Sequence, residues 1–485
     1  MMIDVGRMML EILPEIGLLI LIGVVLVLDL FWRKSRKKLG WVSFAGLLLI
    51  FVLTLVFVQP ARLPQLTWGG MISLDMTGYI FRMIFIAGAA LTVLYAIAND
   101  SLAGRGEFYL LLLTSTLGMC FMASAADLIM LFLAIETTTV PLFVLAGFLT
   151  RDQKSVESGI KYLLFAAMTS AVMLYGFTWL YGFSGTTQLY QIAERLKYGF
   201  VPQAAVVAAM MLVLVGFGFK ISAVPFHFWA PDVYDGAPYP VAGFLSTASK
   251  AAGFAVLARA LFVIFPLQTE TWTLIVALLS TASMFVGNLL ALAQKNIKRL
   301  LAYSSIAQAG YILIGVAADS PLGTSGVIYY LSAYLLTNLA AFGIVALVGR
   351  AVGSDEISAY AGLSRRSPAL ALAMLVVMLS LGGIPPFAGF IGKLLVFAAA
   401  IERGLIWLAI LGVINTIVAL FYYLTVLKVI YLYRSEEEDK PLAVSSAAGT
   451  ALVICIVGII ALGVVIAPLY GWSTDAAATL LFLPR

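Results

Sequence analysis

Residues 215–229 read VGFGFKISAVPFHFW, an apolar run that contains a lysine, Lys220, and a proline, Pro225. In a membrane a charge at mid-bilayer depth costs about 2.5–3.5 kcal/mol, so it is retained only where it faces protein or water. A proline removes a backbone donor and ends or kinks the helix before it. Broken helices of this kind place polar groups at the membrane midplane in transporters. The stretch therefore predicts a membrane protein that moves ions.

The composition of the whole chain agrees with this prediction. Of 485 residues, 62% are hydrophobic and 11% are charged, against about 45–50% and about 25% in soluble domains. Because a spanning helix needs about 20 mostly apolar residues, we expect an all-α polytopic protein with about fourteen transmembrane helices. The expected spans are 12–32, 40–59, 73–98, 107–125, 127–149, 159–183, 201–224, 240–265, 271–294, 299–318, 323–349, 367–400, 404–433 and 443–470. Thirteen or fifteen crossings are alternatives, because only the turn Ser124–Asp127 divides the run 107–149.

The distribution of basic residues predicts the orientation. The run RKSRKK at 33–38 and most other loop lysines and arginines fall in alternate loops, which share one side of the membrane. Positively charged loops stay on the cytoplasmic side, so both termini are predicted on the outer side. Each basic run is a short loop beside a span, and nucleic acid is not an expected partner.

Cofactor motifs are missing from the sequence. Its two cysteines, Cys120 and Cys455, lie within predicted spans, and it has one histidine. It has no C-x-x-C, no Walker motif and no glycine-rich nucleotide fingerprint after a strand, so we expect no bound cofactor or metal.

A second stretch, SLGGIPPFAGFIGKLLVF at 380–397, resembles the first, because a Pro-Phe pair again breaks an apolar run near a lysine, Lys393. Five spans separate the two breaks, in the seventh and twelfth helices. An odd offset implies two five-helix repeats inserted in opposite directions. We expect one membrane domain, 1–485, made of three N-terminal helices (1–106), a first repeat (107–265), a second repeat (271–433) and a C-terminal loop and helix (434–485).

Glu136, five residues before Pro141, where a third helix break is expected, is a candidate partner for Lys220. Burial disfavours the ammonium form of a lysine and a nearby carboxylate favours it, so a pair that opens and closes can gate a proton. A static salt bridge, or a lysine that extends to a helix end, is the alternative.

Further polar residues lie in the apolar runs. Lys250, among small residues, is a candidate central relay, and Lys393 is a candidate final one. His227 suits a proton shuttle, or is a hydrogen-bonded loop residue. For Arg82 and Arg259, which could reach an interface, structural roles are expected. Other hydroxyl and amide side chains at helical spacing carry a water wire or bond helices together: Tyr303, Ser304, Ser305 and Gln308.

Five segments carry a resemblance to a known family: 108–119, 123–148, 225–255, 295–315 and 380–397. They resemble the antiporter-like membrane subunits of proton-pumping NADH:quinone oxidoreductase, respiratory complex I. DVYDGAP and a lysine at position 393 favour the N-type subunit. Stand-alone cation/proton antiporter subunits share much of this plan and are the alternative.

The resemblance implies the fourteen-span architecture and a function. Glu136 and Lys220 would form the ion pair of the fifth and seventh helices, with Lys250 in the eighth and Lys393 in the twelfth. The chain would translocate protons in a bacterial cell (inner) membrane as one subunit of a translocase. NADH, FMN, iron–sulfur clusters and quinone would be bound by partner subunits. The partners would be other membrane subunits, including antiporter-like ones, and through them the redox arm.

Two positions depart from the family pattern. Gln308 stands where a histidine is usual, and an amide cannot titrate. Tyr239 stands where threonine is common, and we expect a change in packing only. A membrane scaffold with structural salt bridges is a third hypothesis for the chain.

Overall fold

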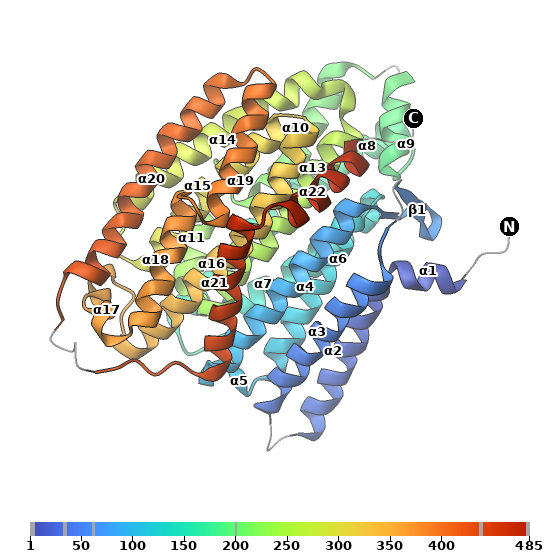
Figure 1. Cartoon of the computed structure of the whole chain (residues 1–485). Coiled ribbons are helices and arrows are strands. Elements are labelled where there is room, and N and C mark those ends of the chain that lie inside the picture. Colours follow the sequence, from blue (N-terminus) through green and yellow to red (C-terminus); the bar gives the residue numbers. More distant parts are fainter. Residues whose placement is uncertain (1–4, 33–35, 61–63, 199–200, 436–439, 482–485) are drawn as a thin grey trace.

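A computed structural model describes residues 5–32, 36–60, 64–198, 201–435 and 440–481, drawn in Figure 1. Part of the basic run, residues 33–35, lies outside these ranges. Within them thirteen helices are long and apolar enough to cross a membrane. The expected all-α polytopic fold is confirmed, with one small addition: β1 (Gln65–Thr67) and β2 (Ile72–Leu74) form a two-stranded antiparallel sheet.

The N-terminal part packs beside the main bundle (Figure 1). Its helices are α1 (Val5–Glu11), α2 (Leu13–Phe31), α3 (Lys38–Phe57), α4 (Met76–Ile97) and α5 (Asp100–Ala103). Asp75 caps α4 by accepting a hydrogen bond from the backbone N–H of Gly78 at 2.7 Å. Such a cap satisfies one of the donors that a helix start leaves free.

The next helices include the first broken one. They are α6 (Gly106–Ser124), α7 (Leu128–Ala146), α8 (Gln153–Ser184), α9 (Leu189–Tyr198), α10 (Gln203–Ile221), α11 (Trp229–Gly236), α12 (Tyr239–Phe244), a π-helical turn (Leu245–Ser249) and α13 (Lys250–Ile264). The turn Ser124–Asp127 divides α6 from α7 as predicted, because Asp127 caps α7. The helix α9 occupies a segment that the sequence marked as a loop.

Pro141 does not break its helix, contrary to the sequence expectation. The helix α7 runs without interruption through Pro141, five residues after Glu136. Membrane helices tolerate proline where neighbouring groups satisfy the freed backbone.

The last helices contain the second break. They are a 3₁₀ turn (Pro266–Gln268), α14 (Thr269–Leu292), α15 (Ile297–Ala317), α16 (Pro321–Val352), a 3₁₀ turn (Ile357–Tyr360), α17 (Leu363–Arg366), α18 (Pro368–Gly382), α19 (Ala388–Glu402), α20 (Ile406–Leu432), α21 (Ser446–Val464) and α22 (Ala467–Leu481). The span expected at 443–470 is confirmed as α21, which ends earlier than expected, at Val464, and a further helix, α22, follows it. Pro468 lies in the first turn of α22, where proline is tolerated.

The two breaks share one backbone geometry. Ser222 ends α10 and Gly383 ends α18, both in the left-handed conformation, with φ of 58° and 77°. The following backbone N–H groups return to Gly218 O at 2.8 Å and Leu379 O at 3.0 Å. This is the Schellman arrangement of helix ends. Figure 1 shows that α10 starts near α9 and α18 starts near α17, at opposite ends of the bundle.

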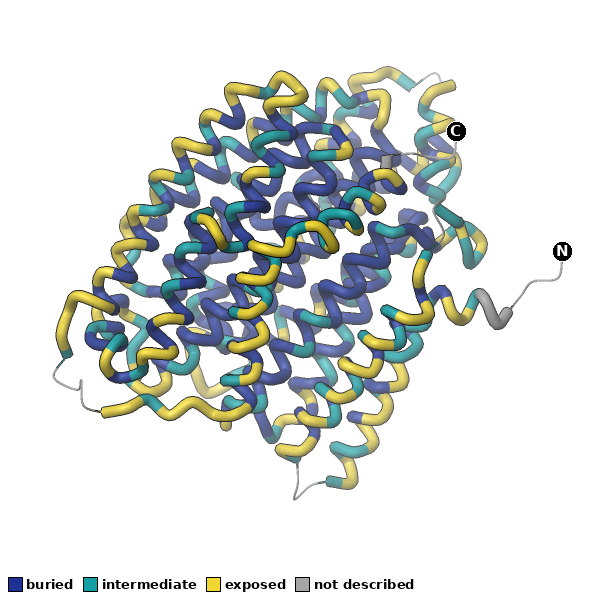
Figure 2. The backbone as a smooth tube through the Cα atoms, in the orientation of Figure 1, coloured by how far each residue is buried: buried dark blue, intermediate teal, exposed yellow. Residues whose placement is uncertain are grey.

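Burial separates central helices from peripheral ones. The helices α13, α15 and α16 lie inside the bundle, whereas α2, α3 and α20 expose one face along their length (Figure 2). Those exposed faces are apolar, with Ile20 62% and Phe421 68% accessible, as a surface in contact with lipid requires.

Candidate functional site

Three lysines from three helices lie deep in the bundle. Lys220 at the end of α10, Lys250 at the start of α13 and Lys393 in α19 are 4%, 2% and 3% exposed. Glu136 in α7 is half-buried. No salt bridge links any of the three lysines to a carboxylate within the described ranges.

Glu136 and Lys220 each bind a hydroxyl group. The Lys220 Nζ donates to Thr139 Oγ1 at 2.9 Å, one turn after Glu136 on α7. The Glu136 Oε1 accepts from Ser170 of α8 at 2.7 Å. The carboxylate is still near enough to act electrostatically on Lys220. The structure therefore shows the two charges close together but not in direct contact.

The stem of Lys220 packs against Gly253 of α13, one turn after Lys250. A Cβ on Gly253 would lie 2.8 Å from Cγ2 of Ile221 and 3.1 Å from Cγ of Lys220, so these side chains fill the space that the glycine leaves. The Lys250 Nζ donates to both the carbonyl and the hydroxyl of Ser305 in α15, each at 2.9 Å. The Tyr234 ring lies 6.0 Å away. The π-helical turn directly precedes Lys250, and such turns are frequent at functional sites.

Gln308 and Lys393 share one acceptor at the second break. The Gln308 Nε2 donates to the carbonyl of Leu381 at 3.0 Å. The Lys393 Nζ donates to the same carbonyl at 3.1 Å and to Gly382 O at 3.3 Å. It also lies 4.5 Å from the centre of the Tyr311 ring. The four charged residues and Gln308 thus form a row from α7 to α19.

The hydroxyl groups that line this row were not predicted, with two exceptions. Ser304 and Ser305 were named from the sequence, whereas these were not: Thr139, Ser170, Tyr234, Tyr330, Tyr334 and Tyr423. The sequence has 21 tyrosines, and tyrosine is common at membrane interfaces. Nothing in the sequence separates the tyrosines that line the row from the others.

His227 lies in the first break, 5% exposed, with its ring 4.4 Å from that of Phe228. It follows Lys220 by seven residues in the same break, and its role as a shuttle stays a prediction.

Two predicted structural residues form buried ion pairs instead of reaching an interface. Arg82 Nε lies 2.8 Å from Glu15 Oε1, and both side chains are 1% exposed. Arg259 NH1 lies 2.7 Å from Asp75 Oδ2, again with both side chains almost fully buried. These pairs join α2 to α4 and α4 to α13.

Tyr239 does more than alter packing. Its hydroxyl donates to Asp355 Oδ1 at 2.8 Å, and the Lys298 Nζ lies 4.7 Å from the centre of its ring. The expectation of a packing change alone was wrong, because the ring places its hydroxyl next to a carboxylate of a distant loop.

The short helix α11 lies between the first break and one end of the bundle, and ion pairs hold it there. Asp232 accepts from Lys161 of α8 at 2.6 Å and from Arg299 of α15 at 2.8 Å. Partial burial alone would raise the pKa of Asp232, but the hydrogen bonds and charges of these two cations hold it below its usual value. The Trp229 indole of α11 also stacks on Tyr162 of α8, with ring centres 4.6 Å apart.

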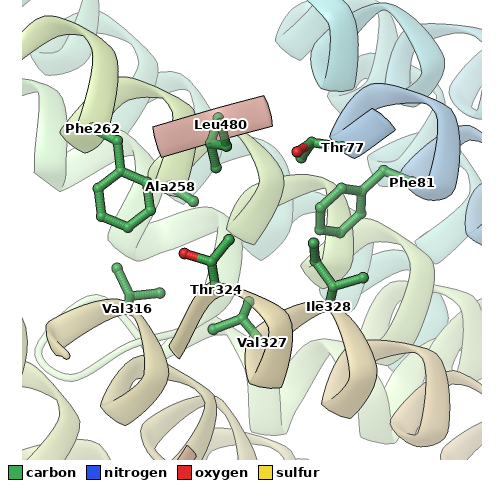
Figure 3. Close-up of a pocket in the computed structure, with 9 residues that line it drawn as sticks. All are labelled: Thr77, Phe81, Ala258, Phe262, Val316, Thr324, Val327, Ile328 and Leu480. Atoms are coloured by element: carbon green, nitrogen blue, oxygen red, sulfur yellow. The ribbon is translucent and has the colours of Figure 1, made fainter. Parts of the chain in front are cut away.

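Figure 3 shows a pocket between α4, α13, α15, α16 and α22. Its lining is apolar except for the hydroxyls of Thr77 and Thr324, and Thr77 already donates to Ala476 O at 3.0 Å. It offers no charged group to an ionic ligand. In the described part of the chain no group of three or more His, Cys, Asp or Glu residues could hold a metal ion.

A polytopic bundle with broken helices and a buried row of lysines defines a class, the membrane proteins that move ions through their interior. Residues 125–419 match the family described as NADH:quinone oxidoreductase/Mrp antiporter, TM. Similar curated proteins include "NADH-quinone oxidoreductase subunit N" of Heliobacterium modesticaldum, 42% identical over 95% of this chain and 97% of the relative. The protein of the same name from Moorella thermoacetica is 42% identical over 93% and 94%.

Solved structures agree. A chain of respiratory complex I from Thermus thermophilus is 34% identical, with a TM-score of 0.80, covering 94% of this chain and 98% of that one. A chain of the Mrp complex from Dietzia sp. has a TM-score of 0.84 at 23% identity, over 98% and 97%, and shows the shared fold. This chain belongs to the NADH:quinone oxidoreductase/Mrp antiporter membrane family, and the resemblance seen in the sequence is confirmed.

Proposed function

We propose that this chain is the N-type membrane subunit of a NADH:quinone oxidoreductase and that it translocates protons along Glu136, Lys220, Lys250 and Lys393. The observation that supports this relay is that the three lysines are buried without carboxylate partners in the described ranges. An unpaired buried charge is costly, so a purely structural role gives no reason to keep three of them. Arg82 and Arg259, which are paired, show what structural charges look like in the same fold.

The Glu136–Lys220 pair is the control point of the relay. With the carboxylate close, the ammonium form of Lys220 is favoured, and when it withdraws the lysine releases a proton toward Lys250. The hydroxyls of Thr139 and Ser170 hold the two groups apart at present. A small rearrangement of these hydrogen bonds is enough to switch the pair.

Partner subunits supply the energy in this proposal. NADH, FMN, iron–sulfur clusters and quinone are bound by those subunits, which include antiporter-like membrane subunits and, through them, the redox arm. The half-buried Glu136 and Ser170 lie between helices with otherwise apolar outer faces. A carboxylate there is better covered by a partner subunit than by lipid.

We also propose the arrangement in the membrane. The chain sits in a bacterial inner membrane with both termini outside, since basic loops favour the inside. Residues 107–265 and 271–433 are two inverted five-helix repeats. The common geometry of the two breaks, entered from opposite ends of the bundle, supports this.

The test is Lys220→Ala in the assembled complex, with NADH-driven proton pumping and quinone reduction both measured. We expect both to fall at least about tenfold, equivalent to ~1.4 kcal/mol in the barrier. Lys197→Ala, which removes an exposed lysine of α9, is the matched control. Undiminished pumping in Lys220→Ala would refute the relay.

A second assay addresses the alternative of a stand-alone cation/proton antiporter. The purified chain is reconstituted alone in vesicles with an imposed sodium or potassium gradient. Antiport without partner subunits would favour that alternative, and its absence together with co-purification of NADH- and quinone-binding subunits would favour the present proposal.

A further inference from the structure

The amide of Gln308 interrupts the row between Lys250 and Lys393. It lies one turn after Ser305, which binds Lys250, and it donates to Leu381 O, which also binds Lys393. Its other contacts are equally fixed: Nε2 donates to Tyr423 Oη at 3.2 Å and Oε1 accepts from the Tyr330 hydroxyl. An amide neither gains nor loses a proton near neutral pH. Gln308 therefore holds its neighbours in position by hydrogen bonds, and a proton must pass through other groups.

The hydroxyl of Tyr423 lies beside the amide of Gln308. Tyr423 belongs to α20, is 1% exposed, and its Oη lies 2.5 Å from Ser304 Oγ. Because Gln308 Nε2 can only donate, Tyr423 Oη accepts from it. In the pair with Ser304 either hydroxyl can be the donor, so Tyr423 can also accept from Ser304 and direct its own hydrogen elsewhere. A hydroxyl that accepts and donates at once can pass a proton on without changing its own charge.

A second hydroxyl bridges the distance to Lys250. Tyr334 of α16 is 3% exposed, and its oxygen has no hydrogen-bond partner among the described residues. Polar groups close enough to act on it include Tyr234, Tyr423 and Ser305, and Ser305 is the residue that binds Lys250. A buried hydroxyl without a partner costs about 1–3 kcal/mol, and such a group in a native fold requires an explanation.

Two glycines make room for the last step. A Cβ on Gly382 would lie 3.9 Å from Cδ2 of Tyr423, and a Cβ on Gly383 would lie 2.8 Å from Cδ of Lys393 and 3.4 Å from its Nζ. The tyrosine ring and the lysine thus approach the same pair of residues.

We propose that the hydroxyls of Tyr334 and Tyr423 carry protons between Lys250 and Lys393, with Gln308 as a positioning residue that holds Tyr423. This inference rests on the proposed function. One N–H bond of the Lys250 ammonium breaks and one N–H bond forms on Lys393. Each hydroxyl oxygen gains a proton on one side and releases its own hydrogen on the other, so both tyrosines end neutral and no oxidant or reductant is needed.

The experiment compares single-atom deletions in the assembled complex. Tyr423→Phe and Tyr334→Phe remove one oxygen each and keep the ring. Tyr422→Phe is the control, since its hydroxyl donates to Asn288 Oδ1 at 3.0 Å and not to Gln308. We expect the rate of NADH-driven proton pumping to fall at least about tenfold in Tyr423→Phe, as the rate–barrier relation gives for ~1.4 kcal/mol. The drop in Tyr334→Phe should be severalfold, and Tyr422→Phe should be unchanged.

Rescue separates a proton carrier from a structural group. Gln308→His introduces a ring that titrates near neutral pH, so adding it to Tyr423→Phe should restore pumping. Loss of pumping in Tyr423→Phe without rescue would overturn the proposal in favour of a structural tyrosine. Normal pumping in both tyrosine variants, with pumping lost in Lys250→Ala and Lys393→Ala, would overturn it and leave the proposed function standing. Normal pumping in the two lysine variants would instead overturn the proposed function.

Discussion

The two helix breaks have the same backbone but different caps. At the first, the Trp229 indole donates at 3.2 Å to the carbonyl of Phe219, which also accepts from the Ser222 N–H, and Lys220 is left to bind Thr139. At the second, the ammonium of Lys393 itself caps the freed carbonyls of Leu381 and Gly382. The C-terminus of a helix carries partial negative charge and favours a cation.

This difference assigns different tasks to the two lysines. The neutral cap at the first break leaves Lys220 free to respond to Glu136. The charged cap at the second break ties Lys393 to the backbone, so a change in its charge also changes how that helix end is held. The first break can therefore switch the charge of Lys220. At the second break, protonation of Lys393 can change how the end of the helix is held.

The largest expected effect comes from removing each lysine without leaving a gap. In Lys393→Met the carbonyls of Leu381 and Gly382 lose their charged donor, and hydrogen bonds to charged groups are worth about 1.5–3 kcal/mol. In Lys220→Met a buried, unpaired charge disappears while Trp229 still caps the helix. We expect the purified complex to unfold at a lower temperature with Lys393→Met and at an equal or higher one with Lys220→Met.

Both variants should lose proton pumping. Only the unfolding temperature therefore shows whether a lysine caps its helix end. Equal destabilisation by the two substitutions would mean that the ammonium of Lys393 does not hold the end of α18.

A somewhat smaller effect is expected at the residues that begin each break. Gly383 has φ of 77° and a Cβ there would press on Lys393 at 2.8 Å, whereas Ser222 already carries a side chain at φ 58°. A left-handed conformation costs about 1–2 kcal/mol in residues other than glycine. Gly383→Ala should destabilise the complex by about that amount, and Ser222→Gly should leave its stability unchanged or higher, in the same thermal assay. If Ser222→Gly is the more damaging of the two, the breaks differ in backbone as well as in cap.

The sequence predicted the breaks and the charged residues because both are exceptions to an apolar background. A lysine or a Pro-Phe pair in an apolar run is visible without any structure, and Glu136, Lys220, Lys250 and Lys393 all lie where those exceptions placed them. The helices α9 and α22 were not predicted, because short amphipathic or apolar helices have no such marker.

The hydrogen bonds of the site could not be predicted in the same way. Whether Tyr334 or Tyr423 faces a lysine depends on the rotation of α16 and α20 against their neighbours, and long-range packing sets that rotation. Pro141 misled for a related reason, since the continuity of α7 depends on neighbours that satisfy its backbone. The π-helical turn before Lys250 has no sequence pattern at all.

A moderate effect is expected from the ion pairs that hold the half-helix after each break. Asp232 of α11 is bound by two cations, whereas beyond α19 a single, longer pair joins Arg403 to Asp319 at 3.6 Å. These groups are partly exposed, so each pair is worth about 0.2–1 kcal/mol. Asp232→Asn should lower pumping more than Asp319→Asn, with Glu157→Gln as a control that leaves both cations on Asp232.

The pH dependence of the ion pairs formed by Asp232 has a definite sign. The pKa of Asp232 is below its usual value, so its contribution is complete above about pH 3.9, the unfolded value, and is lost as the pH falls through the lower folded value. Thermal stability between pH 5 and 8 should therefore differ by a constant amount between the parent and Asp232→Asn. A difference that grows across that interval would contradict a stabilising role for the ion pairs of Asp232.

The smallest expected effect on proton pumping comes from a contact that joins the two halves of the fold. Tyr239 of α12 donates to Asp355, in the loop before α17. Tyr239→Phe removes this bond and keeps the ring under Lys298, so we expect a loss of about 0.5–1.5 kcal/mol, typical of one hydrogen bond, and unchanged pumping. Tyr239→Thr also removes the ring and should cost more. If Tyr239→Phe instead lowers pumping as much as Asp232→Asn does, the two halves are coupled through this hydroxyl and cannot be treated as separate units.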